Sequence, residues 1–191
     1  ETDNAFRTYR FDIKSHLKKG KNVLELLFSS PVEWVKQTNA KDPLVKNFMG
    51  LSGIQHLRKP SYHFGWDWGP SLPLSGITGD IYIQGYETRI EDVKIVQDHK
   101  NGIVKIKTEV KAEGRGDGEI LLKVYSPEGK IIASENSIGI DAAFDTIIAQ
   151  PELWYPNGLG SQPLYNVEIT LNASGKIIDK KVFKYRIEAI K

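Results

Sequence analysis

Hydrophobic and polar positions alternate with a period of two along most of this chain. The segment IVKIKTEV places Val104, Ile106, Thr108 and Val110 on one side of an extended backbone and charged residues on the other. Successive side chains of a strand point to opposite faces, so this pattern predicts a half-buried antiparallel strand. The segment NVEITLN, residues 166–172, repeats the pattern.

Similar runs predict strands elsewhere in the chain. They lie at residues 9–13, 23–28, 81–84, 93–97, 119–125, 130–134, 146–149 and 176–186. Polar segments rich in glycine, asparagine and lysine, such as DHKNG and NASGK, separate them and are typical of turns. In residues 90–191 about seven short strands follow one another, which indicates an immunoglobulin-like or fibronectin-like β-sandwich.

The first part of the chain differs from the second. Residues 1–87 contain three or four predicted strands and long loops, too few for a closed core of two sheets. We therefore expect residues 1–87 to be the C-terminal part of a domain that begins earlier, and residues 88–191 to be a second domain. The long connection at residues 31–57 holds Gly50 and Gly53 and shows a weak helical pattern at 32–37. Connections of this length usually carry function or cover a site.

Composition excludes several classes of protein. Hydrophobic residues make up 40% of the 191 residues, charged residues 26%, and the net charge is +2. These values are those of a water-soluble globular protein, and they argue against disorder and nucleic-acid binding. No apolar run approaches the roughly 18 residues of a membrane span, so we expect no membrane partner. Without cysteine the chain forms no disulfides or thiolate sites, while the compartment stays open. His56 and His63 lack a third metal ligand at a suitable spacing.

The segment GWDWGP, residues 65–70, carries the most distinctive chemistry. It sets Trp66, Asp67 and Trp68 side by side between glycines and a proline, where regular structure usually stops. A sugar ring stacks its apolar face on an indole, and its hydroxyl groups donate to a carboxylate. The other interpretation is that both tryptophans belong to a core and that Asp67 caps a turn. The residue types alone leave both interpretations open.

Three segments together resemble β-mannosidases of glycoside hydrolase family two. The first is GWDWGP with the preceding LRKPSY, the second is YRFDIKSHLKKGKNVLELLFSSPV at residues 9–32, and the third is LWYPNGLGSQPLYNVEI at residues 153–169. The resemblance covers nearly the whole chain. GWDWGP is the most specific of the three for mannosidases, whereas the other two are shared with β-galactosidase and β-glucuronidase relatives.

The resemblance implies an all-β chain: the C-terminal part of a galactose-binding-like jelly-roll sugar-binding domain, then an immunoglobulin-like β-sandwich. In this family a (β/α)₈ barrel with two catalytic glutamates follows, so this chain is expected to be a non-catalytic portion without a cofactor. Trp66, Asp67 and Trp68 would bind the terminal mannose of a β-mannoside, with Asp67 accepting from its hydroxyl groups. The implied partners are that substrate and the barrel, and a periplasmic, secreted or lysosomal location would be compatible.

Two other functions compete with this interpretation. A stand-alone carbohydrate-binding module would need a complete first sandwich, which the strands of residues 1–87 do not supply. An extracellular immunoglobulin-like interaction module would explain residues 90–191 and leave GWDWGP without a role. Trp154, in the segment LWYPNG, is interpreted as an anchor in the core or between domains rather than as a platform for a ligand.

Overall fold

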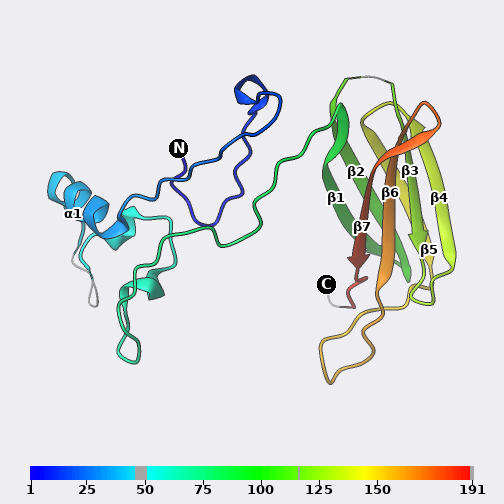
Figure 1. Cartoon of the computed structure of the whole chain (residues 1–191). Helices are drawn as coiled ribbons and strands as arrows, with labels where there is room; N and C mark the ends of the chain where they lie inside the picture. Colours follow the sequence, from blue (N-terminus) through cyan, green and yellow to red (C-terminus); the bar gives the residue numbers. More distant parts are fainter. Residues whose placement is uncertain (46–50, 116, 190–191) are drawn as a thin grey trace. The chain divides into compact units, whose positions relative to one another are not determined.

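The computed structural model describes residues 1–45, 51–115 and 117–189. The chain divides into two compact units, Glu1–Ile83 and Gln84–Lys191, which are described one after the other (Figure 1). Strands in two antiparallel sheets dominate the described residues, and there is little helix. The predicted all-β class is therefore confirmed.

In the part of the second unit that the structure describes there are seven strands. They are β1 (Thr88–Lys100), β2 (Ile103–Gly114), β3 (Glu119–Tyr125), β4 (Ile131–Ile138), β5 (Ala142–Ala149), β6 (Tyr165–Ala173) and β7 (Lys176–Tyr185). Every strand predicted between residues 93 and 186 is present, and most of them are longer than predicted. The alternation of apolar and polar residues is thus a reliable guide to strands in this part of the chain.

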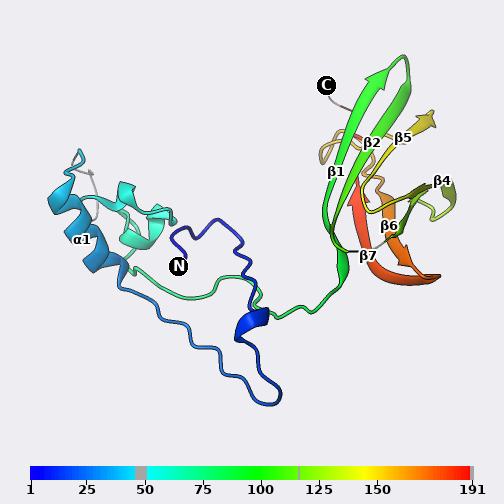
Figure 2. The ribbon, with the colours of Figure 1, turned by 90° about the horizontal axis from the view of Figure 1, so that it is seen from above.

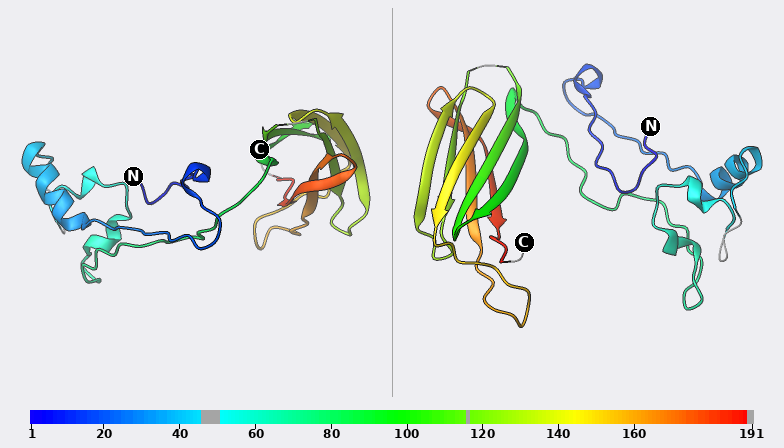
Figure 3. Two further views of the ribbon diagram at one scale, coloured as in Figure 1. Left: turned by 45° about the horizontal axis from the view of Figure 1, so that its top comes forward. Right: turned by 180° about the vertical axis from the view of Figure 1, so that it is seen from behind.

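The strands form two facing sheets, seen as layers in Figures 2 and 3. One sheet has the order β1-β2-β5 and the other the order β4-β3-β6-β7. In constant-type immunoglobulin domains the fourth strand lies in the sheet of the first, second and fifth. Here β4 instead pairs with β3 along its length. The unit is therefore an immunoglobulin-like sandwich with its fourth strand in the second sheet.

The core of the sandwich lies between the sheets and is filled by the inward residues of the central strands. On β2, β3 and β6 the buried hydrophobic side chains are Val104, Ile106, Val110, Ile120, Leu122, Val124, Tyr165, Val167, Ile169 and Leu171. Their neighbours in sequence on β2 and β3 are mostly exposed or half-buried. Burial of one face of each sheet is what the period-two pattern predicts.

The first unit contains one α-helix within its described residues, α1 (Pro31–Lys41). Ser30 is its N-cap and accepts a hydrogen bond from the backbone N–H of Glu33, and Pro31 occupies the first turn, where its missing N–H costs nothing. Val35 is the buried residue of the helix. The weak helical pattern at 32–37 thus corresponds to a real helix, whereas Gly50 lies outside the described residues.

Short 3₁₀ helices are the other helical elements among the described residues of this unit. They are η1 (Lys14–His16), η2 (Ile54–His56) and η3 (Ser61–Phe64). The strands predicted at residues 9–13, 23–28 and 81–84 are wrong for this structure, because these stretches belong to no sheet. Within the described part of the first unit, bridge pairing is limited to Asn4 with Arg58 and Trp66 with Gly69. Alternation alone does not make a strand, since its backbone groups need a paired neighbour.

Candidate functional site

The segment that carries the predicted site residues is anchored at its base. Phe64, the last residue of η3, is only 2% exposed. Beside it the backbone N–H of Leu72 donates to the carbonyl oxygen of His63 at 2.9 Å. Gly65 has a φ of 98°, a value that is unfavourable for side chains larger than glycine. The buried Phe64 and the hydrogen bond between Leu72 and His63 therefore hold both ends of the loop, and Gly65 turns the chain out of η3.

The tip of the loop is a tight two-residue turn. The N–H of Trp66 donates to the carbonyl oxygen of Gly69 at 3.2 Å, and the N–H of Gly69 donates back to Trp66 at 3.1 Å. This reciprocal pair leaves Asp67 and Trp68 as the two residues of the turn. Residues 66–69 thus form a small hairpin that presents its central side chains.

The side chains of the tip face solvent in this unit. Trp66 is 51% exposed and Trp68 83%, and their rings meet edge to face with centroids 5.5 Å apart. Within the described residues neither tryptophan is part of a core. Asp67 is exposed, and within residues 1–45, 51–115 and 117–189 its carboxylate has no hydrogen-bond or ion-pair partner. Its side chain does not cap the turn.

The arrangement is suited to a ligand that has both hydroxyl groups and an apolar face. An unpartnered carboxylate offers strong acceptor sites, and charge-assisted hydrogen bonds are about twice as strong as neutral ones. Two indole rings beside it offer flat apolar surfaces. The described residues contain no group of three or more His, Asp or Glu side chains that could hold a metal ion. Among the same residues, every helix is too short or too polar to cross a bilayer.

Trp154 is held within the second unit. Its N–H donates to the carbonyl oxygen of Ile187 at 2.7 Å, and its carbonyl oxygen accepts from the N–H of Ala189 at 3.0 Å. The guanidinium of Arg186 lies over its ring, 4.9 Å from the centroid, and pairs with Glu188 at 2.8 Å. These contacts support the prediction that Trp154 is a structural anchor.

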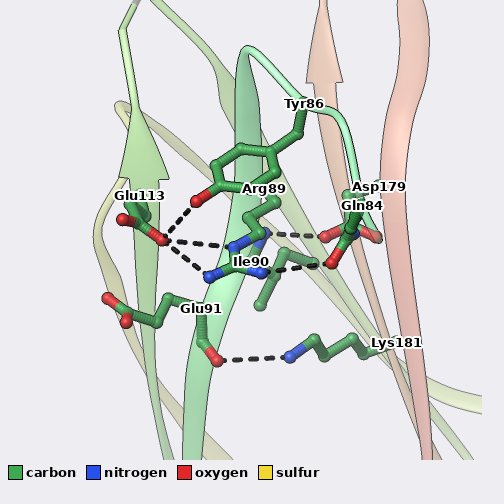
Figure 4. Close-up of polar contacts among 8 residues, drawn as sticks. All are labelled: Gln84, Tyr86, Arg89, Ile90, Glu91, Glu113, Asp179 and Lys181. Atoms are coloured by element: carbon green, nitrogen blue, oxygen red, sulfur yellow. Dashed lines mark hydrogen bonds and ion pairs between the residues drawn. The ribbon is translucent and has the colours of Figure 1, made fainter. Parts of the chain in front are cut away.

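The sequence did not indicate the polar cluster shown in Figure 4, which lies where the chain enters the sandwich. Arg89 donates to one carboxylate oxygen of Glu113 from Nη2 at 2.8 Å and from Nε at 3.2 Å. The hydroxyl group of Tyr86 donates to the same oxygen at 2.9 Å, and the guanidinium of Arg89 lies 4.3 Å from the Tyr86 ring centroid. Arg89 also donates to Gln84 at 3.1 Å.

Two pKa shifts reflect this cluster. The hydrogen bond to Glu113, together with partial burial, raises the pKa of the Tyr86 hydroxyl. Burial acts against the charged form of Arg89, but its hydrogen bond to Glu113 and the surrounding negative charge raise its pKa above the ordinary value. Both groups therefore keep their protons over the physiological range.

A second set of contacts in Figure 4 joins β1 to β7, which belong to different sheets. The N–H of Ile90 donates to the carboxylate of Asp179 at 2.7 Å. The ammonium of Lys181 donates to the carbonyl oxygen of Glu91 at 3.3 Å. The start of β1 is thus tied to both sheets of the sandwich.

Comparison with known protein families identifies the class of protein to which this chain belongs. Residues 1–79 match the family described as "Glycosyl hydrolase 2 galactose-binding domain-like". Residues 88–185 match the family described as "Glycosyl hydrolases family 2". The chain belongs to glycosyl hydrolase family 2.

The similar individual proteins include several β-mannosidases. "Beta-mannosidase B" of Aspergillus flavus is 32% identical over 182 residues, which cover 90% of this chain and 21% of that protein. "Beta-mannosidase B" of Neosartorya fischeri is 32% identical over 200 residues, covering 98% of this chain and 23% of that protein. The crystal structure of beta-D-mannosidase from Dictyoglomus thermophilum matches with a TM-score of 0.72 and 25% identity over 83% of this chain and 20% of that one.

The predicted resemblance to β-mannosidases of this family is therefore confirmed. The chain spans about a fifth of the length of the curated relatives it matches.

Proposed function

We propose that this chain is the non-catalytic N-terminal portion of a retaining, exo-acting β-mannosidase that removes terminal β-D-mannosyl residues. In this proposal residues 1–87 are the C-terminal part of a jelly-roll sugar-binding domain, and residues 88–191 are a sandwich spacer for a catalytic barrel. The similarity to proteins named β-mannosidase supports the substrate class. The observation that carries the proposal is the exposed hairpin with its unpartnered Asp67.

Each side chain of the hairpin has a role in the proposed pocket. The carboxylate of Asp67 accepts hydrogen bonds from two hydroxyl groups of the terminal mannose, a geometry that a single carboxylate permits. One of the two indoles forms a wall against the apolar face of the sugar ring. The two-residue turn at Asp67 and Trp68 keeps these groups next to one another, which reduces the conformational entropy lost on binding.

Catalysis is assigned to the barrel. Hydrolysis with retention needs a general acid and a nucleophile whose carboxyl groups lie about 5 Å apart on a rigid frame. We propose that both of these groups belong to the barrel and that Asp67 only binds the sugar. The 191-residue chain should therefore leave an aryl β-mannoside intact, which a chromogenic assay at high protein concentration measures. Turnover that stays with the chain through further purification would contradict this assignment.

The role of Asp67 is tested by Asp67→Ala in the longer enzyme. Loss of a charge-assisted hydrogen bond costs about 1.5–3 kcal/mol, so kcat/KM should fall roughly ten- to a hundredfold. The melting temperature should stay the same, because the side chain is exposed and has no partner among the described residues of its own unit. Asp80→Ala is the matched control, since Asp80 is another exposed carboxylate of the first unit. Normal kinetics with a lowered melting temperature would make Asp67 a structural residue.

A further inference from the structure

A hollow on the outer face of the sheet β4-β3-β6-β7 has no role in the proposed function. Its volume is about 560 Å³, and it lies over β3 and β6, next to residues 117–118 and the turn between β6 and β7. The residues of its floor alternate with core residues along both strands, so their side chains point away from the core. Pockets that bind small molecules are commonly of this size.

A β-bulge shapes the end of the sheet where the hollow lies. In the β6–β7 ladder Leu171 pairs with Asp179 and Asn172 pairs with Ile177, which leaves Ile178 without an opposite residue. An extra residue of this kind bends the strand and increases its twist. β7 bends sharply near its turn with β6, as Figure 1 shows. The sheet is therefore curved at this end.

Two polar atoms of β6 in the hollow have no partner. Thr170 is only 3% exposed, and neither its Oγ1 nor the Oδ1 of Asn172 has a hydrogen-bond partner among the described residues. Buried polar groups are nearly always hydrogen-bonded, because the loss of water without a replacement costs free energy. On the floor of an open hollow, a ligand can supply the missing partners.

Each of these polar atoms lies beside an apolar side chain of the hollow. Leu121 is directly opposite Thr170 in the β3–β6 ladder, and Ile177 is directly opposite Asn172 in the β6–β7 ladder. Ile177 is 64% exposed. A ligand that fits this surface has hydroxyl groups and apolar C–H groups close together, as a sugar ring does.

The charged residues of the hollow disfavour an anionic ligand. Its lining contains the carboxylates of Asp117, Glu119 and Glu168 and the ammonium of Lys123. Even with Lys180, which pairs with Glu168 at 2.8 Å, negative charge is in excess there. A phosphate or an acidic sugar would be repelled. Hydroxyl groups, in contrast, can donate to a carboxylate and accept from an ammonium.

We propose that this hollow binds an uncharged oligosaccharide, as a second sugar site in addition to Trp66, Asp67 and Trp68. Hydroxyl groups of the sugar donate to the Oδ1 of Asn172 and exchange hydrogen bonds with Thr170, while an apolar face of the sugar lies on the apolar side chains. Because no aromatic residue lines the hollow, the Kd should be in the millimolar range. The choice of a mannoside as ligand rests on the proposed function, whereas the hollow and its unpartnered groups do not.

The site is tested by NMR titration of the 191-residue chain with β-1,4-mannobiose. The amide signals of Gly118, Thr170 and Asn172 should shift with a common Kd, while that of Ile106 in the core should not shift. Glucuronic acid should bind about tenfold more weakly, because its carboxylate meets negative charge. Unshifted signals at the hollow, or glucuronic acid that binds equally well or more tightly, would overturn the inference. Shifts confined to residues 66–68 would overturn it as well and leave the proposed function intact.

The contribution of the floor is tested by Thr170→Val. Loss of one neutral hydrogen bond should raise the Kd at the hollow about three- to tenfold and leave any shifts at residues 66–68 unchanged. Thr108→Val is the matched control, because it removes another buried and unpartnered hydroxyl group that lies in the core and not in the hollow. Its Kd should equal that of the wild type. Asn172→Leu, which removes the other acceptor, is the second variant if Thr170→Val does not fold. A wild-type Kd in whichever of these two variants folds would overturn the inference.

The other possible occupant is a further part of the longer enzyme, and chemical labelling distinguishes it from a sugar. Lys123 lines the hollow, so acetylation of its ammonium, followed by mass spectrometry, reports whether the hollow is open. Its rate should be the same in the 191-residue chain and in the longer enzyme, and saturating mannobiose should lower both about threefold. Mannobiose should not change the rate at Lys105, whose ion pair with Asp145 lies on the other sheet. Acetylation of Lys123 that is tenfold slower in the longer enzyme without sugar would show that polypeptide covers the hollow, and would overturn the inference.

Discussion

At the scale of single residues, two threonines of the sandwich differ in how their hydroxyl groups are satisfied. Thr108 on β2 is fully buried, and its Oγ1 has no hydrogen-bond partner among the described residues. Thr146 on β5 is also buried, but its hydroxyl group donates to the carboxylate of Glu135 on β4 at 2.7 Å. A buried polar group without a partner loses its hydration and gains nothing in return.

This difference predicts opposite effects of the same substitution. Thr108→Val should raise the free energy of unfolding by about 1 kcal/mol, because it replaces an unsatisfied hydroxyl group by a methyl group of similar volume. Thr146→Val should lower it by about 1 kcal/mol, because it leaves Glu135 without its donor. Urea unfolding followed by the amide signals of β2 and β6 measures both values. A destabilised Thr108→Val would mean that its hydroxyl group has a partner in solution.

At the scale of elements, the turn between β1 and β2 determines the register of the longest hairpin. Asn101 and Gly102 have φ values of 52° and 76°, as a type I′ turn requires. Ser174 and Gly175 form a turn of the same kind between β6 and β7, with φ values of 49° and 73°. The twist of this turn type matches that of the strands it connects.

Asn101 therefore contributes to stability through its backbone. Asn101→Ala should lower the free energy of unfolding by about 1 kcal/mol, because alanine tolerates a positive φ less well than asparagine. Asn101→Gly should have little effect, since glycine adopts this conformation at no steric cost. Thermal unfolding of the two variants beside the wild-type chain measures the difference. Equal melting temperatures for Asn101→Ala and the wild type would show that the turn conformation is not under this constraint.

At the scale of the whole molecule, the two units differ in how much of their structure is paired. Seven strands and a continuous apolar core hold residues 84–189 together, within the part of that unit that the structure describes. In the first unit many large apolar side chains are exposed, including Val23 and Leu27 at 83% and 93%. Burial of apolar surface is the main source of stability, so the sandwich should be the more stable unit by a wide margin.

Hydrogen exchange of the 191-residue chain tests this expectation. Amides of β2, β3 and β6 should exchange only through global opening of the sandwich, whereas amides of the first unit should exchange much faster. A chain of residues 84–191 alone should keep the slow exchange of these strands, because their partners all lie within the second unit. Equal and strong protection of both units would contradict this prediction.

The sequence alone predicts the strands of the second unit. Its strand predictions for the first unit are wrong, because a strand needs a hydrogen-bonded neighbour. Alternation predicts the seven strands of the sandwich because each of them finds a neighbour and a buried face. The same alternation at residues 9–13 and 23–28 produces no strand within the described part of the first unit. The difference is not local, because the hydrogen bonds of a strand are made with residues far away in the sequence.

The pairing of Arg89 with Glu113 is another feature that the sequence alone does not predict. Counted from the turn at Asn101 and Gly102, the regular hairpin register would place Arg89 opposite Gly114. A β-bulge between Ile90 and Asp92 shifts the register by one residue and places Arg89 opposite Glu113 instead. Nothing in the spacing of the charged residues predicts this bulge.

Local chemistry and short-range pattern were enough to predict the strands and turns of the sandwich. They also singled out Trp66, Asp67 and Trp68 as candidate sugar-binding residues. Only the tertiary structure decided that both tryptophans are exposed, that Asp67 has no partner among the described residues, that β4 joins the second sheet, and that Arg89 reaches Glu113. The reason is physical: propensity and alternation act between neighbours along the chain, whereas burial, register and ion pairing depend on which distant segments pack together.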